Sequence, residues 1–272
     1  MNSLIGALAQ YSTVIVTGGS SGIGKSFIEL GHKVNPGLWF CNLSRHAPDI
    51  IIPGIRLNHF ACDLSRPAEV ERVVPVLLAA LAQAAPTGRV LLINNSGFGA
   101  YGHFPAPSLE HQLEMLDVNI RGLVQLTGRL LPVLRARGGA ILNVASTAAF
   151  QPTAYLAAYG ASKAFVLHWS LALNEELRGT GVHTLAVCPG PTATQFFLRA
   201  GLAPGSVAAG LSQSAEQVVW ASYRALAAGR RQVVPGWKNQ VAAFCVSRLP
   251  KPLAARLAAW VLARYRLQQV RR

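Results

Sequence analysis

Six apolar runs, rich in β-branched residues and separated by longer helix-compatible segments, limit the fold of this chain more than any other feature. The runs lie at 13–17, 38–43, 55–62, 89–95, 139–146 and 182–190. Their hydrophobicity is continuous rather than alternating, which is typical of strands buried on both faces. Helices are expected at 22–34, 67–84, 108–136 with an interruption near Asn119, 155–178 and 214–228. Strands and helices that alternate in this way predict an α/β fold with a doubly wound parallel sheet flanked by helices on both faces.

The composition suits one domain with a C-terminal helical extension. The 272 residues are 51% hydrophobic and 13% charged, which is enough to bury a large core. Because no internal repeat or low-complexity linker is found, we expect one domain over 1–236 and a helical arm over 237–272. Pro75 and Pro132 fall inside two of the predicted helices, where we expect kinks or local ends.

Targeting and metal-binding signals are missing from the sequence. The first residues lack the basic segment of a signal peptide, and no charge-free apolar stretch reaches the roughly 18 residues of a membrane span. We therefore expect a cytoplasmic protein without a signal peptide or a transmembrane helix. The four cysteines are far apart, without a CxxC pair or a nearby histidine cluster. This spacing favours reduced thiols and predicts no metal site.

The stretch "TGGSSGIG" at 17–24 connects the first predicted strand to the first predicted helix. Glycines in this position allow a tight turn and a close approach of the backbone to a pyrophosphate at the helix N-terminus. The placement predicts a dinucleotide site on a Rossmann-type sheet. The residues expected to contact the cofactor in this loop are Gly18, Ser20, Ser21, Gly22, Ile23 and Gly24.

The ends of the second and third strands bear on which dinucleotide binds. The second strand leads into "CNLSRHAP", which has no carboxylate to bind a free ribose 2′-hydroxyl and instead offers Ser44 and Arg45. A guanidinium suits a 2′-phosphate, so the sequence favours NADP(H) over NAD(H), unless Arg45 is an ordinary solvated loop residue. After the third strand, Asp63 and Leu64 are placed to contact the adenine, or Asp63 is simply the N-terminal cap of the next helix.

Six motifs together resemble the short-chain dehydrogenase/reductase family over residues 13 to about 235. They are "TGGSSGIG", "NNSG" at 94–97, Asn119, Ser146, "YGASK" at 159–163 and "PGPTAT" at 189–194. One departure is Ser96, where the family usually has alanine. The resemblance implies an NAD(P)-dependent oxidoreductase. It also implies cofactor contacts from Asn94, Asn95, Gly97, Tyr159, Lys163, Pro189, Thr192 and Thr194.

The chemistry of carbonyl reduction explains why Ser146, Tyr159 and Lys163 belong together. Reduction needs a hydride from the nicotinamide and a proton from a positioned acid. Tyr159 and Lys163 stand four residues apart, on one face of a helix, and an ammonium nearby would lower the tyrosine pKa from its usual value of about 10. Ser146 can donate to the substrate oxygen. The resemblance also assigns Lys163 to the nicotinamide ribose, and Asn119 to a water that links Lys163 to solvent.

The segment "QFFLRAGLAPGSVAAGLS" after the last motif resembles the family's mobile substrate flap. Phe196 and Phe197 in it favour a hydrophobic ketone, aldehyde or alcohol as substrate, which would also meet Ser146 and Tyr159, although these phenylalanines could equally fill ordinary core. A competing function is a non-catalytic dinucleotide-binding sensor or scaffold. Such a protein can lose the tyrosine or the lysine, whereas this chain keeps all four residues of the set.

The net charge of +14 is concentrated in the C-terminal part of the chain. All 11 acidic residues and 14 of the 25 basic residues lie at or before Glu216, which leaves a segment with basic residues alone. Its aromatic and basic residues are typical of a peripheral membrane anchor, but Arg264 interrupts the apolar stripe of Leu253, Leu257 and Trp260. An arm packed beside the substrate cleft or the interface of a homodimer or homotetramer are the alternatives. Nucleic-acid binding is not favoured, since no reading motif is present.

Overall fold

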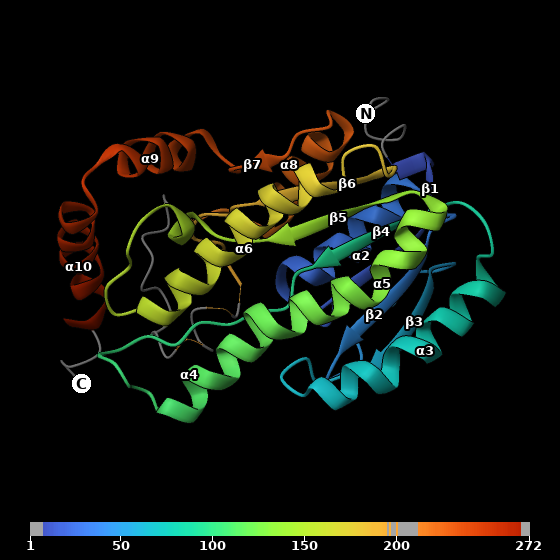
Figure 1. The fold of residues 1–272 in the computed structure, drawn as a ribbon, viewed down its shortest axis with the longest axis horizontal. Coiled ribbons are helices and arrows are strands. Elements are labelled where there is room, and N and C mark those ends of the chain that lie inside the picture. The colour runs from blue at the N-terminus through green and yellow to red at the C-terminus, as the bar shows by residue number, and fades with distance from the viewer. Residues whose placement is uncertain (1–7, 195, 197–199, 201–211, 268–272) are drawn as a thin grey trace.

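The computed structural model describes residues 8–194, 196, 200 and 212–267, with side chains as far as Ala263. Its seven strands form one parallel sheet in the order β3-β2-β1-β4-β5-β6-β7 (Figure 1). The chain winds outward from β1 to β3, crosses back to β4 and then winds the other way. The doubly wound parallel sheet predicted from the sequence is therefore confirmed. The strands are β1 (Tyr11–Thr17), β2 (Trp39–Ser44), β3 (Arg56–Ala61), β4 (Arg89–Asn94), β5 (Gly139–Val144), β6 (Val182–Val187) and β7 (Gln232–Val233).

Six of these strands coincide with the six apolar runs, but burial on both faces was predicted wrongly for β3, which lies at the edge of the sheet and has no buried residue. Every residue of β2 and of β5 is buried, as a strand covered by helices on both faces requires. The seventh strand was not predicted, because β7 has only two residues and no apolar run of its own. It pairs with Ala186 and Val187 at the end of β6.

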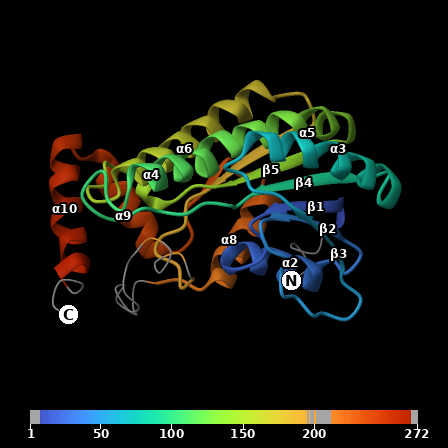
Figure 2. The same cartoon turned by 90° about the horizontal axis from the view of Figure 1, so that it is seen from below.

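Helices cover both faces of the sheet (Figure 2). One layer holds α2 (Gly22–Val34) and α8 (Ala215–Ala227), which pack on each other and on the sheet through Phe27 and Tyr223. The other layer holds α3 (Pro67–Ala84), α4 (Leu109–Leu116), α5 (Leu123–Arg137) and α6 (Ala157–Glu176). Its apolar side chains, such as Leu77 and Leu130, fill a second core on the opposite face of the sheet.

The predicted interruption near Asn119 is a π-helical segment, Asp117–Gly122, between α4 and α5. Of the kinks or local ends predicted at the two helix-internal prolines, the local ends are not found. Helix α3 continues through Pro75 and α5 continues through Pro132. Both prolines are exposed, so water can take the hydrogen bonds that a proline interrupts.

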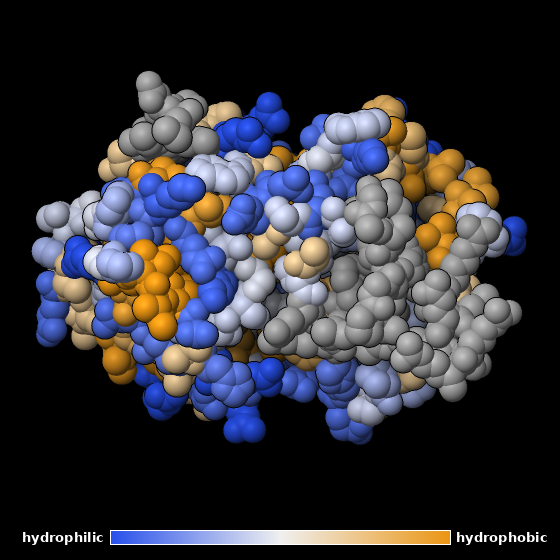
Figure 3. Space-filling view, turned by 180° about the vertical axis from the view of Figure 1, so that it is seen from behind, coloured by the Kyte–Doolittle hydropathy of each residue, from blue (hydrophilic) through white to orange (hydrophobic). Residues whose placement is uncertain are grey.

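Two further helices, α9 (Trp237–Arg248) and α10 (Lys251–Leu267), lie at the end of the molecule to which the strand arrows point (Figure 1). Leu249 and Pro250 separate the two helices. The Tyr101 hydroxyl donates to the Leu262 carbonyl at 2.6 Å and ties α10 to the loop that follows β4. Apolar side chains gather over this end of the surface (Figure 3). Within the described residues, no helix is long and apolar enough to cross a membrane.

Candidate functional site

A cleft of about 870 Å³ runs across the carboxyl ends of the strands. It lies where β1 and β4 are neighbours and the winding direction reverses, which is the usual binding position on an open α/β sheet. The loops after β1 to β6 line it, together with residues of α4, α6, α9 and α10. The sequence-predicted site residues that line it are Gly18, Ser20, Ser21, Gly22, Ile23, Ser44, Arg45, Asp63, Leu64, Asn95, Gly97, Ser146, Tyr159, Lys163, Pro189, Thr192, Thr194 and Phe196.

The turn after β1 requires its glycines. Gly18 and Gly22 have φ angles of +68° and +55°, in the left-handed region that other residues rarely adopt. A Cβ on Gly24 would collide with the carbonyl oxygen of Gly18. Gly24 therefore does not line the cleft itself. It allows the first turn of α2 to pack directly beneath the loop, so the loop keeps its shape.

Buried polar groups hold this loop from below and from the side. The Asn42 side chain, fully buried in β2, accepts a hydrogen bond from the Gly19 amide at 2.8 Å. The Thr17 hydroxyl accepts from the amides of Asn95 and Ser96, each at 2.9 Å, and Asn95 Nδ2 donates to the Thr17 carbonyl at 2.9 Å. These bonds join the loops after β1 and β4, so both sides of the switch point are fixed relative to each other.

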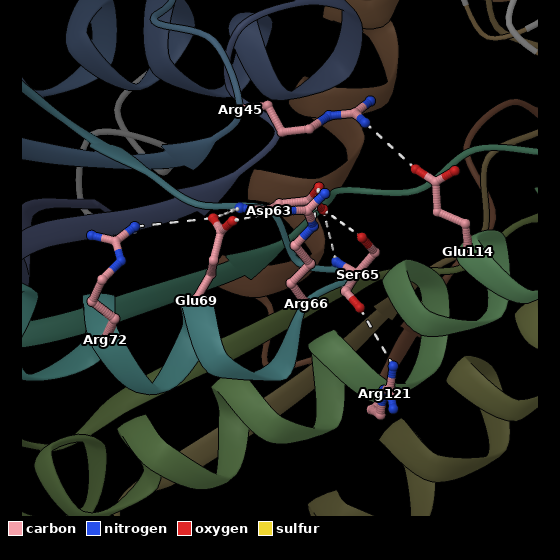
Figure 4. Close-up of polar contacts among 8 residues, drawn as sticks. All are labelled: Arg45, Asp63, Ser65, Arg66, Glu69, Arg72, Glu114 and Arg121. Carbon is pink, nitrogen blue, oxygen red and sulfur yellow. Dashed lines mark hydrogen bonds and ion pairs between the residues drawn. The ribbon is translucent and has the colours of Figure 1, made fainter.

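The residues after β2 form the far end of the cleft (Figure 4). The Arg45 side chain is 58% exposed and meets Glu114 of α4, with 3.5 Å between Nη1 and Oε1. Ion pairs this exposed contribute little, so the guanidinium is available to another anion. Ser44 differs, because its hydroxyl already donates to the His46 carbonyl at 2.6 Å and accepts from Asn42 Nδ2 at 2.8 Å.

Asp63 lies beside this end of the cleft and is not the cap of α3, whose N-cap is Arg66. Its carboxylate accepts from the Ser65 amide at 3.0 Å and from the Ser65 hydroxyl at 2.7 Å (Figure 4). Burial works to raise the pKa of Asp63, but the Ser65 hydrogen bonds and the charges of Arg45 and Arg66 outweigh it and lower the pKa. The group is therefore anionic at neutral pH and faces Arg45 from below.

At the centre of the cleft, α6 and the end of β5 bring Ser146, Tyr159 and Lys163 together. Tyr159 and Lys163 are 8% and 4% exposed, and Tyr159 has a hydrogen bond with the Ser146 side chain. Lys163 Nζ donates to the Val144 carbonyl at 2.9 Å and lies 5.9 Å from the centre of the Tyr159 ring. The three groups thus share one wall of the cleft.

The electrostatics of this trio correct one expectation from the sequence. Burial raises the pKa of Tyr159 to about 12, and only the Ser146 hydrogen bond opposes it. The expected lowering of this pKa by Lys163 is not among its causes, and the Lys163 ammonium instead donates to the Val144 carbonyl. Burial also lowers the pKa of Lys163 to about 8, with the neighbouring Cys188 opposing.

Two predicted residues lie behind the cleft wall rather than on it. Asn119 is fully buried; its amide donates to the Phe98 carbonyl at 3.0 Å and to Ser162 at 3.1 Å and accepts from the Phe98 amide. Asn94 Nδ2 donates to Thr127 and Asn143 inside the core, away from the cleft. Asn119 is thus placed to fix the loop after β4, whereas Asn94 joins β4 to α5 and β5, and the water assigned to Asn119 stays a prediction.

The loop after β6 closes the cleft above the glycine-rich turn. Thr194 lies opposite Gly22, where a Cβ would come within 3.2 Å of the threonine methyl group. Thr192 is buried and donates to the Gly190 carbonyl at 2.9 Å. The Phe196 ring lies 5.2 Å from that of Tyr159, centre to centre, as a substrate contact would require. Phe197 and the remainder of the predicted flap, apart from Ala200 and Ser212, fall outside the described residues.

The sequence left open an arm packed beside the substrate cleft, and the structure places the arm there, but none of its lining residues was predicted. Residues from both arm helices line the cleft, and all are apolar: Val246, Ala254, Leu257, Ala258, Val261 and Leu262. A partial signal was present, because Ala254, Ala258 and Leu262 recur every fourth residue and form a small-to-medium apolar stripe. Glu114 was missed as well, since an acidic residue in a helix gives no sign that it will face a strand end far away in the sequence.

The residues present fit a dinucleotide. The glycine turn offers backbone groups that side chains would otherwise cover, at the N-terminus of a 13-residue helix. A guanidinium lies at one end of the cleft and a tyrosine–lysine pair lies at its centre. The glycine turn and the guanidinium suit phosphates, the lysine suits ribose hydroxyls, and the tyrosine suits a carbonyl oxygen.

Comparison with known proteins agrees with this geometry. The family model described as short chain dehydrogenase matches residues 12–202. The chain is 32% identical over 193 residues to a serine 3-dehydrogenase of Agrobacterium fabrum, covering 68% of this chain and 74% of that protein. It is 35% identical over 184 residues to an NADP-dependent 3-hydroxy acid dehydrogenase of Escherichia coli, covering 65% and 71%.

Among solved structures, the fold is similar to that of a short chain dehydrogenase from Burkholderia cenocepacia in complex with NADP. The TM-score is 0.74 at 25% sequence identity, and the match covers 91% of this chain and 98% of that one. The structural likeness therefore extends beyond the matched family region into the C-terminal part of the chain.

Proposed function

The chain belongs to the short-chain dehydrogenase family and is an NAD(P)-dependent oxidoreductase by that membership, and we propose that it uses NADP(H) to reduce a hydrophobic ketone or aldehyde to an alcohol, or to catalyse the reverse oxidation. One observation carries the proposal. A single cleft joins the glycine turn, an exposed Arg45, the Ser146–Tyr159–Lys163 trio and an apolar C-terminal wall.

Residues on one side of the cleft would hold the cofactor. The turn from Gly18 to Ile23 would take the pyrophosphate, Arg45 the 2′-phosphate, and Lys163 the nicotinamide ribose. When bound, the cofactor supplies or accepts the hydride. The absence of a carboxylate after β2, with Arg45 in its place, supports NADP(H) over NAD(H).

Tyr159 would act as the proton donor in reduction. Because burial raises its pKa to about 12, the phenol is protonated at neutral pH, which is the form that can donate to a developing alkoxide. Ser146, which has a hydrogen bond with Tyr159, would donate to the same substrate oxygen and hold the carbonyl in place for the hydride. In the oxidation direction Tyr159 must first lose its proton, so that direction depends more strongly on the positive charge of Lys163.

The surroundings of Tyr159 support an apolar substrate rather than a hydroxy acid. On the side away from the nucleotide, the described lining is mainly apolar and comes from Phe98, Leu156, Phe196 and the arm helices, with Gln151 and Thr153 as polar members. Apart from Lys163, no cationic side chain among the described lining residues stands near Tyr159 to bind a carboxylate. The serine and 3-hydroxy acid dehydrogenases that this chain resembles act on acids, so the substrate is where we expect this protein to differ from them.

A substrate panel tests the proposal. Long-chain aldehydes, aliphatic and steroid ketones, 3-oxoacyl esters, L-serine and 3-hydroxy acids are each offered with NADPH or NADH (NADP⁺ or NAD⁺ for the acids), and the absorbance of the reduced nicotinamide is followed. We expect turnover of hydrophobic carbonyls with NADPH. Tyr159→Phe should lower kcat about 10²–10⁴-fold while NADPH binding is retained, since only the proton donor is lost.

Tyr155→Phe is the matched control, because Tyr155 precedes the same helix but does not line the cleft. Its activity should equal that of the wild type. Full activity of Tyr159→Phe would refute the role of Tyr159. If NADPH binds but no carbonyl or alcohol in the panel reacts, the competing function of a dinucleotide-binding sensor or scaffold is favoured.

A further inference from the structure

The two arm helices carry most of the large apolar side chains that are exposed in the described structure. Five of them do not line the cleft; we call these five the arm face. They are Trp237, Val241, Phe244, Leu253 and Trp260. Exposure of Trp237 reaches 71% and that of Phe244 59%. The three on α9 are spaced i, i+4 and i+7, so they form one stripe on that helix.

The arm face continues into the cleft. At about 100° per residue, Leu253 and Trp260 lie together on α10, Leu257 and Val261 follow around the helix, and Ala258 comes next. Leu257 and Val261 line the cleft, and Ala258 is buried against it. Over residues 253–261, an apolar arc therefore joins the outer surface of α10 to the wall beside the substrate end, and Arg264 falls in line with it only one turn after Trp260.

The charges around the arm face all have one sign. Lys238, Arg248, Lys251 and Arg256 are exposed on α9 and α10, and the sequence has no acidic residue after Glu216. Two of these cations lie over exposed rings: Lys238 Nζ is 5.9 Å from the Trp237 ring centre, and the Arg248 guanidinium is 4.5 Å from that of Phe244. Aromatic rings with cations beside them are typical of helices that lie in the headgroup region of a bilayer.

We propose that the arm face docks on an anionic lipid bilayer, with α9 and α10 lying in the headgroup region. Charge decides between this occupant and a second copy of the chain. In a twofold contact, the arm face of one copy would meet the arm face of the other. The four cations of each copy would then share one interface, and neither arm would supply a carboxylate. Anionic headgroups complement the same cations, and the acyl region takes the rings and aliphatic side chains.

Docking in this orientation brings the substrate end of the cleft to the lipid. Because the apolar arc runs from the arm face to Leu257 and Val261, a lipophilic carbonyl compound dissolved in the bilayer would reach Tyr159 without crossing bulk water. This consequence rests on the proposed function, whereas the docking itself does not. A binding measurement without substrate therefore tests docking independently of catalysis.

The test is sedimentation of the full chain with vesicles of phosphatidylcholine alone or with about one third phosphatidylglycerol. We expect at least tenfold stronger binding to the anionic vesicles and a loss of this preference at high salt, since each cation near the surface adds roughly fivefold. Trp237→Ser with Phe244→Ser, and separately Lys238→Glu with Arg256→Glu, should each weaken binding by tenfold or more.

Two control variants make the same chemical changes elsewhere. Ile51→Ser removes an exposed apolar side chain that lies outside the arm, and Arg135→Glu reverses an exposed charge on α5. Both should bind vesicles like the wild type, and circular dichroism checks that every variant folds. Recovery of the wild type in the supernatant with both vesicle types would overturn the proposal. So would a dimer, seen by light scattering, that dissociates in the Trp237→Ser/Phe244→Ser variant and does not bind vesicles.

Discussion

The nucleotide end and the substrate end of the cleft lie on the same edge of the sheet, but they are built from different parts of the chain. The nucleotide end comes from loops that follow β1, β2 and β3, all within the first quarter of the sequence, and backbone and buried polar groups such as Asn42 hold its shape. The substrate end combines the loop after β4 with α6 and with α9 and α10, whose contribution is apolar.

This difference teaches which part of such a protein tolerates change. A turn that depends on left-handed glycines and on a buried Asn42 leaves few alternatives at each position. An apolar wall needs only side chains of suitable size, so Leu257 or Val261 can be exchanged with graded effects. We therefore expect substitutions at the nucleotide end to act on folding and cofactor affinity, and those at the substrate end to act on substrate choice.

The largest effect is expected from Gly24→Ala. The added methyl group would meet the Gly18 carbonyl oxygen, so the free energy of unfolding should fall by about 2–3 kcal/mol and NADPH affinity should fall with it. Gly128→Ala, in α5 where nothing lies within 4 Å of the new methyl group, is the matched control and should raise stability by about 0.5–1 kcal/mol. Urea unfolding measures the stability of each variant, and fluorescence titration measures its affinity for NADPH. Equal effects of Gly24→Ala and Gly128→Ala would contradict the packing argument.

The second prediction concerns the pair of Arg45 and Glu114. Arg45→Ala should raise the KM for NADPH about 10–100-fold and leave that for NADH nearly unchanged, because only the 2′-phosphate loses a partner. Glu114→Gln should do the opposite and tighten NADPH binding a few-fold, since the carboxylate competes for the same guanidinium. Equal loss with both cofactors would show that Arg45 supports the loop rather than the phosphate.

A third prediction concerns the buried ammonium of Lys163, which lies between the nucleotide end and the substrate end of the cleft. Burial lowers the pKa of Lys163 to about 8, so the charged form is present below this pH and is lost above it. If the charge is needed for ribose binding and for Tyr159, kcat/KM for reduction should fall about tenfold per pH unit above pH 8. A flat profile to pH 10 would exclude this role.

The smallest effect is expected at the substrate end, from a charge placed on the cleft wall. Leu257→Asp should lower kcat/KM for a hydrophobic carbonyl about tenfold and leave the KM for NADPH unchanged, because Leu257 lines the apolar side of the cleft. Leu253→Asp, one turn earlier and outside the cleft, should leave activity on a water-soluble carbonyl unchanged. Equal losses in both variants would point to unfolding of α10 rather than to a substrate contact.

How much of the fold and of the site could be predicted from the sequence differs from one element to another. Six strands and the main helices could be placed from hydrophobic runs, because a buried parallel strand needs continuous apolar residues, although the edge strand β3 is not buried. The two-residue β7 has no such run and is defined only by pairing with β6. Predicted contacts such as Gly18 and Tyr159 line the cleft, whereas Asn94 turned out to face the core, since its motif fixes the position but not the direction of its side chain.

By itself, the sequence determined the doubly wound sheet, the glycine turn and the Ser146–Tyr159–Lys163 set, because each depends on residues close together or on a repeating pattern of buried positions. Only the tertiary structure decided that Glu114 faces Arg45, that burial raises the pKa of Tyr159, and that α10 forms a wall of the cleft. The physical reason is distance along the chain. Electrostatic fields and apolar contacts depend on which segments meet in space, and no local pattern encodes that meeting.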